Sequence, residues 1–189
     1  LDAGLSGRKI CEAIRNVNYS EDKIQGIIIS HEHSDHIKGA GIICRKLKIP
    51  LYITERTYYA GRYCLGELPY GVHHFASNEE FTINDIHVKP FPSSHDAADS
   101  CNFVFQRIGD DESRLAIITD LGYSSNLTLS RLKSVTTLII ESNHDEKMLL
   151  DGPYPWELKQ RVKSKHGHLS NNQAKELVRE IMHHKLKNI

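Results

Sequence analysis

Apolar residues in the first third of the chain recur first at helical spacing and then in short strand-like runs. The helical positions are Ile10, Ala13, Ile14 and Val17. Ile27–Ile29 follow as a β-branched run, typical of a strand buried on both faces. After a polar stretch, the pattern predicts a helix over about 37–47 and a short strand over 51–53. This order predicts a βαβ-like start.

The later part of the chain shows both hairpin and helix patterns. Residues 81–83 and 86–88 alternate in polarity across Asn84-Asp85, which predicts a two-residue hairpin. Further strands are expected over 102–106, 115–118 and 138–140, and a last helix over 170–184. Ser170 is a plausible cap for that helix, whose apolar stripe is Ala174, Leu177, Val178, Ile181 and Met182. Strands in βα units and in hairpins predict a sheet, or a pair of sheets, with outer helices.

Composition narrows the class of protein. The chain has 189 residues, 39% of them hydrophobic, and no repeat or Pro/Gly/Ser-rich linker, so one domain over 1–189 is expected. The longest aliphatic run is far shorter than the roughly 20 residues of a membrane span, and no signal segment opens the chain. Four cysteines without a C-x-x-C pair suggest reduced thiols. We therefore expect a soluble, cytoplasmic protein that does not contact membranes.

Histidine is the unusual residue, with 12 in the chain. Three of them lie within Ser30–His36, directly after a predicted strand and before a predicted helix. His31 and His33 would project to the same side of an extended segment and could hold one metal ion. Asp35 and His36 could turn toward a second ion, since imidazole and carboxylate suit zinc, manganese or iron. A polar loop with solvent-exposed histidines is the alternative, but four ligand-type residues at this spacing favour a site for two metals.

This H-x-H-x-D-H motif resembles that of the metallo-β-lactamase superfamily. The resemblance implies an α/β protein of αββα architecture, with two facing sheets and outer helices. It also implies that Asp2 orients a ligand from beside the site, that His95 joins His31 and His33 around one ion, and that Asp120 bridges to the ion held by Asp35 and His36. Taken alone, Asp120 could cap a helix starting near residue 124, and His95 could be an ordinary loop histidine.

Two of these positions favour one branch of the superfamily. Asp120 stands where zinc β-lactamases commonly carry Cys, and His33 stands where the di-iron oxidoreductases usually carry Glu. Segments 141–145 and 167–171 closely resemble the YycJ (WalJ) family and, more distantly, ribonuclease Z. The resemblance implies a phosphodiester hydrolase, an exonuclease on DNA or RNA, with two divalent ions (Zn or Mn) and a metal-bridging hydroxide.

The same resemblance assigns residues to the substrate. Asp35, His168 and His144 are the expected catalytic residues, with the two histidines binding the phosphate or protonating the leaving oxygen. His168, Ser170 and Asn171 lie at the start of the last helix, where a phosphate is favoured. A loop role is the alternative for His168 and His144. The family's metal set normally ends with one more His beyond that helix, so we expect a domain incomplete at both ends.

Charge is balanced overall but not locally. The formal net charge is zero, which argues against a globally basic nucleic-acid binder. From Lys159 onward there are eight Lys or Arg against two Glu, a net charge of +6. Such a segment could contact a polyanion, or it could be a solvated helix face. Aromatic residues do not interleave with these charges, so base stacking is not predicted from this segment.

Two other functions remain open. The same pair of ions could serve a glyoxalase-like thioesterase or lactonase, which would be indifferent to the basic segment. Alternatively, the chain could be a non-catalytic nucleic-acid-binding or regulatory module with structural metals or none. Nucleic acid or another phosphodiester is the expected partner, and the sequence does not predict the oligomeric state.

Overall fold

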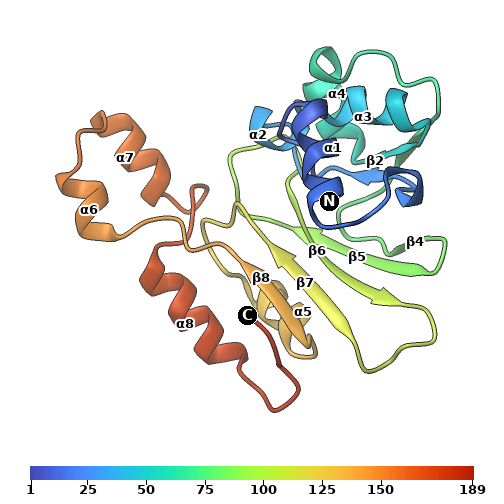
Figure 1. The fold of residues 1–189 in the computed structure, drawn as a ribbon. Helices are drawn as coiled ribbons and strands as arrows, with labels where there is room; N and C mark the ends of the chain where they lie inside the picture. Colours follow the sequence, from blue (N-terminus) through green and yellow to red (C-terminus); the bar gives the residue numbers. More distant parts are fainter. The chain divides into compact units, whose positions relative to one another are not determined.

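The computed structural model describes all residues from Leu1 to Ile189 and divides into two compact units (Figure 1). The first unit comprises Leu1–Ser77 and Ala97–Ser100. The second comprises Asn78–Asp96 and Cys101–Ile189. Each unit contains its own sheet and its own hydrophobic core.

The first unit is a three-stranded parallel sheet with helical connections. Its elements in chain order are α1 (Gly7–Asn16), a 3-10 turn (Glu21–Lys23), β1 (Ile27–Ile28), α2 (Ser34–Ile37), α3 (Ala40–Leu47), β2 (Leu51–Ile53), α4 (Glu55–Leu65) and β3 (Val72–His74). The strand order is β1-β2-β3, with Ile27 opposite Leu51 and Leu51 opposite Val72. The predicted βαβ start is confirmed. Strands β1 and β2 are parallel neighbours, and parallel neighbours need a crossover connection, which here contains α3.

The helix predicted over 37–47 is broken into α2 and α3. The break is at Gly39, whose N–H donates to the carbonyl of Ala3 at 2.7 Å, while the N–H of Ala3 donates to the carbonyl of His36 at 2.7 Å. A Cβ on Gly39 would lie only 2.1 Å from the carbonyl oxygen of Leu5. The first residues of the chain therefore run against this break, which brings Asp2 to the loop between β1 and α2.

The second unit is a five-stranded sheet covered by helices. Its elements are β4 (Phe81–Ile83), β5 (Ile86–Pro92), β6 (Cys101–Arg107), β7 (Arg114–Ile118), α5 (Asn126–Leu132), β8 (Thr137–Ile140), α6 (Glu146–Asp151), α7 (Trp156–Lys163) and α8 (Asn171–Ile181). The strands follow chain order and are antiparallel except for β7 and β8, which are parallel and joined through α5. The predicted hairpin is confirmed, with Asn84 in the left-handed region at φ 50°.

The core of this unit lies between the sheet and the helices α5 and α8. Phe91, Val104 and Leu138 from the strands pack in one buried cluster with Leu132 of α5 and Leu177 of α8. None of the helices in the chain combines the length and the apolar character needed to cross a membrane.

The last helix is shorter than the pattern predicts. Ser170 caps it as expected by accepting the N–H of Gln173, but the helix ends at Ile181 and leaves His183 and His184 outside it. The chain then turns back, and the N–H of Leu138 in β8 donates to the carbonyl of Asn188 at 3.0 Å. The expectation that both histidines lie within the helix was wrong, because pairing with the edge of β8 ends the helix early.

Candidate metal centre

The predicted ligand loop of the first unit gathers three histidines around Ser30. His31 and His33 lie in the loop after β1, and His36 follows in the first turn of α2. His31 is fully buried, and its Nε2 is 3.0 Å from Nδ1 of His33. The ring centroids of His31 and His36 are 4.0 Å apart. Nitrogen atoms this close can share a proton or bind the same ion.

Asp2 holds this loop through its carboxylate. Its Oδ1 accepts the N–H of Ser30 at 2.8 Å, and its Oδ2 accepts the hydroxyl of Ser30 and Nδ1–H of His36, both at 2.9 Å. Asp2 itself adopts a left-handed backbone at φ 55°, a conformation that Asp tolerates better than most residues. The carboxylate thus fixes the ring of His36 and leaves Nε2 of His36 as its ligand atom.

Asp35 is placed differently from the histidines of this loop. Its side chain is 79% exposed, and its Oδ2 lies 3.7 Å from Nε2 of His36. It can therefore reach an ion held by His36 only from the solvent side.

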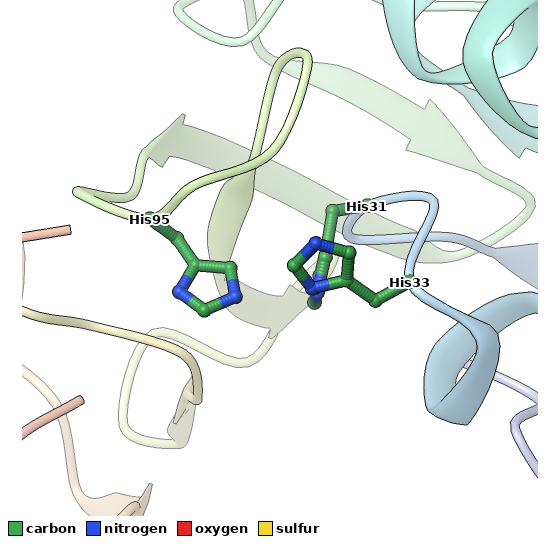
Figure 2. Close-up of side chains that lie close together, drawn as sticks. All are labelled: His31, His33 and His95. Carbon is green, nitrogen blue, oxygen red and sulfur yellow. The ribbon is translucent and has the colours of Figure 1, made fainter. Parts of the chain in front are cut away.

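The second unit brings together three more predicted residues. His95 follows β5, Asp120 follows β7, and His168 precedes α8. One ligand atom from each lies within 4.8 Å of the others. Nε2 of His95 is 3.9 Å and Nδ1 of His168 is 3.6 Å from Oδ1 of Asp120. Figure 2 labels the imidazole of His95 and also draws those of His31 and His33 in the loop after β1.

Glu141 organises this second group, although no role was predicted for it. Its side chain is only 10% exposed and its carboxylate accepts four N–H groups. The donors are the backbone N–H groups of Asp120 at 3.2 Å, Leu121 at 2.9 Å and Leu169 at 2.8 Å, and Nδ1–H of His168 at 3.0 Å. The signal that could have found it is strand pairing, because Ile118 and Ile140 are opposite each other in parallel strands. The residues after both strands must then meet at one edge.

The backbone of Asp120 is held in an uncommon conformation. Its φ is 54°, in the left-handed region that costs roughly 1–2 kcal/mol for most residues other than glycine. Glu141 holds its N–H, and the hydroxyl of Ser93 donates to its carbonyl at 2.7 Å. These bonds on both sides of the residue fix the direction in which its carboxylate points.

The pKa values of His95 and His168 are shifted in opposite directions. Burial lowers the pKa of His95, against the opposing effects of the Gly167 carbonyl and Asp120. Its imidazole is therefore held neutral, the form that binds metals. The hydrogen bond to Glu141 raises the pKa of His168 despite its partial burial. His168 is therefore the better proton donor of the two.

The remaining predicted residues lie around the start of α8. The backbone of His144 pairs with Ser170, and burial lowers the pKa of the His144 imidazole, whose Nδ1 has no hydrogen-bond partner. Ser170 is buried, and its hydroxyl donates to Glu146 at 2.9 Å while capping α8. Asn171 accepts the hydroxyl of Ser142 through Oδ1 at 2.7 Å. Both polar side chains at the helix start are thus engaged within the protein.

The histidines fit a metal centre in the way their rings are oriented. Nδ1–H of His36 donates to Asp2, that of His95 to the carbonyl of Gly167 at 3.1 Å, and that of His168 to Glu141. Because carboxylates and carbonyls only accept, Nδ1 must carry the proton in each ring. His31 follows the same rule, since Ser30 gives its own proton to Asp2 and accepts from Nδ1 of His31 at 2.9 Å. Each ring is left with an Nε2 lone pair, as in metal-binding histidines.

Comparison with known proteins gives consistent matches over most of the chain. A protein of Bacillus anthracis named exodeoxyribonuclease YycJ is 38% identical over 175 residues, which are 92% of this chain and 65% of that protein. A protein of Streptococcus pneumoniae D39 named exodeoxyribonuclease WalJ is 36% identical over 193 residues, covering all of this chain and 70% of that protein. The chain therefore spans about two thirds of the length of these relatives.

The fold is also found among solved structures. The short form of human tRNase Z matches with a TM-score of 0.65 at 17% identity, over 95% of this chain and 76% of that one. A family model described as the β-lactamase superfamily domain matches residues 1–187. With this match over nearly its whole length, and with two sheets and flanking helices of the α/β metallo-β-lactamase fold, the chain belongs to the metallo-β-lactamase superfamily.

Proposed function

We propose that the chain carries the reaction centre of a metal-dependent phosphodiester hydrolase that acts as an exonuclease on DNA. The observation that carries the proposal is the common orientation of three predicted ligand imidazoles, those of His31, His36 and His95, in which Nδ1 is bonded to oxygen and Nε2 carries the lone pair. The two relatives named exodeoxyribonucleases support DNA as the substrate.

The ligands are assigned to two divalent ions, zinc or manganese. In this proposal His31, His33 and His95 would hold one ion, Asp35 and His36 would hold the other, and Asp120 would serve as a ligand to both. Imidazole and carboxylate donors suit both metals. When bound, the ions supply a hydroxide nucleophile and stabilise the negative charge that develops on the phosphate.

The residues of this chain then have distinct tasks. His168 contacts the phosphate or gives its proton to the leaving oxygen, and its raised pKa favours the protonated form that this task needs. Glu141 keeps the His168 ring in place through Nδ1. His144, whose pKa is lowered by burial, is the second residue assigned in this proposal to the phosphate or the leaving oxygen. Ser170 and Asn171 were expected to bind the substrate, but their side chains bond to Glu146 and Ser142, so in this proposal they support the start of α8.

The test is an end-labelled digestion series with manganese, zinc or a chelator. We expect linear DNA to shorten from an end when metal is present, and circular DNA and chelated samples to remain intact. RNA of the same sequence measures the choice of polymer. Asp120→Ala should abolish the activity. The control is Asp111→Ala, which removes an exposed carboxylate from the turn between β6 and β7 and should leave the activity unchanged.

Three outcomes contradict the proposal. Hydrolysis of a thioester or lactone with every polynucleotide left intact identifies a carbonyl hydrolase. Fewer than one bound ion per chain, together with inert DNA, identifies a non-catalytic module. Cleavage by Asp120→Ala at the unchanged rate removes Asp120 from the centre.

A further inference from the structure

Helices α6 and α7 and the segment between them carry an unusual concentration of exposed apolar side chains. Met148, Tyr154 and Trp156 are 75%, 55% and 61% exposed within nine residues of chain, and Leu150 is exposed as well. Figure 1 shows α6 and α7 in orange as a pair of short helices. Because water disfavours so much exposed apolar surface in one place, such a patch indicates a binding partner.

Two hollows flank α7 and divide these side chains between them. The larger, of about 590 Å³, is lined by His144, Met148, Tyr154, Leu158 and Val162 among others. The smaller, of about 320 Å³, is lined by Leu150, Trp156, Gln160 and the two lysines Lys159 and Lys163. Both volumes fall within the range of small-molecule sites, and each hollow combines an aromatic ring with polar groups.

The surrounding charge favours an anionic partner. Residues 156–165 contain four Lys or Arg and a single Glu, a net charge of +3. Lys163 forms no ion pair with the protein, whereas Nε of Arg161 forms an ion pair with Oδ2 of Asp96 at 2.5 Å. Tyr154 and Trp156 lie just before the basic segment, and Trp156 lines the smaller hollow together with Lys159 and Lys163.

Helix α7, which lines both hollows, is hydrogen-bonded to segments that carry residues of the second unit's candidate metal centre. Arg161 of α7 pairs with Asp96, the neighbour of His95. The N–H of His168 donates to the carbonyl of Val162, a wall of the larger hollow, at 3.0 Å. The N–H of Asn143 likewise donates to the carbonyl of Leu169 at 3.1 Å. A strand whose phosphate lies at His168 would next meet the surface of α6 and α7.

We infer that this α6–α7 surface, formed by Met148, Tyr154, Trp156, Lys159 and Lys163, binds the single-stranded part of a DNA substrate. Bases stack on Tyr154 and Trp156, and Lys163 meets a phosphate, which is the combination found where proteins hold single strands without sequence preference. The inference rests on the proposed function, since it identifies the part of the substrate beyond the reacting phosphate.

Trp156 makes the inference directly testable, because it is the only tryptophan in the chain. Unlabelled oligothymidylate of twelve nucleotides is titrated into the protein with a chelator present, so that no hydrolysis occurs. We expect saturable quenching of tryptophan fluorescence. Tyr154→Ala should weaken binding roughly tenfold, as loss of one stacked base does. Lys163→Gln should reduce the slope of log affinity against log salt by about 0.7.

The matched control is Tyr63→Ala, which removes an aromatic ring that is 87% exposed on α4 and should leave binding unchanged. Binding that leaves the emission of Trp156 unchanged, or that resists Tyr154→Ala, overturns the inference. Fluorescence that changes with protein concentration alone, together with a dimer lost in Trp156→Ala, assigns the surface to a second copy of the chain and also overturns it.

A small substrate separates this inference from the proposed function. Tyr154→Ala should lower the rate on oligonucleotides but leave the metal-dependent hydrolysis of bis(p-nitrophenyl) phosphate unchanged, because that compound is too small to reach the α6–α7 surface. DNA hydrolysis without any response of Trp156 refutes the surface alone. Quenching by DNA without hydrolysis of either substrate refutes the proposed function and leaves the surface in place.

Discussion

Replacing Glu141 should damage both the stability of the second unit and its ability to hold metal. The carboxylate is nearly buried and accepts four N–H groups, three from the backbone and one from His168. A buried donor without a partner costs about 1–3 kcal/mol. At the lower end of this range, Glu141→Ala loses about 4 kcal/mol of unfolding free energy.

Glu141→Gln should have a smaller effect with the same direction. Oε1 serves Leu121 and Leu169, whereas Oε2 serves Asp120 and His168. A glutamine keeps one oxygen and turns an NH₂ group toward the other pair of donors. Two donors are then unpaired, and the loss is about 2 kcal/mol.

Urea unfolding of the metal-free protein, followed by circular dichroism, measures these losses. Glu157→Gln on α7 is the control, because Glu157 is exposed and its replacement should change the free energy by less than about 0.5 kcal/mol. Competition with a zinc chelator measures the second effect, an affinity about 10–100-fold weaker in Glu141→Gln. If Glu141→Ala unfolded at the urea concentration of the parent protein, Glu141 could not be what holds Asp120 and His168.

Three further predictions follow from the first unit and from the titrating histidine. Asp2→Asn should weaken metal affinity about 10–100-fold in the chelator competition, because His36 loses the carboxylate that fixes its Nδ1 proton. Equal affinity of the two proteins would show that the ring is oriented without Asp2. Gly39→Ala should lower the melting temperature, because the new Cβ would lie 2.1 Å from the carbonyl oxygen of Leu5. The control is Gly109→Ala, where the Cβ would meet open space and the only destabilisation should come from the backbone strain at φ 83°. His168 has a raised pKa in the folded protein, so its contribution to stability should be complete below the unfolded value of about 6.5 and be lost as pH rises through the folded value. The unfolding free energy of the metal-free protein should therefore fall as pH rises through the folded pKa of His168, and this fall should be absent in His168→Gln. Identical pH profiles of the two proteins would refute the prediction.

Local patterns predicted the parts of the structure that local contacts decide. In the second sheet, β4, β5 and β6 follow the alternation of apolar residues, whereas β7 and β8 follow continuous apolar runs, and the hairpin follows from Asn84-Asp85. The histidine loop was equally visible, because His31, His33 and His36 lie within six residues of chain.

Elements that depend on distant partners were not predictable in the same way. The break between α2 and α3 exists because Gly39 bonds to Ala3, far away in sequence. Helix α7 has no buried residue and therefore no apolar stripe to reveal it. Glu141 gains its role only when β7 and β8 pair in parallel, which single-strand patterns do not specify.

Asp2 and Glu141 solve the same physical problem in the two units. Each is a carboxylate that accepts backbone N–H and the Nδ1–H of a predicted site histidine, His36 for Asp2 and His168 for Glu141. In water a histidine ring turns freely and exchanges its proton between the two nitrogens, so an ion would have to order it on binding. The carboxylates fix the orientation and the tautomer of the ring when the protein folds. The entropy of the free ring is therefore already lost before an ion binds. Metal affinity should therefore depend on Asp2 and Glu141 almost as strongly as on the ligands, although neither residue would touch the ions.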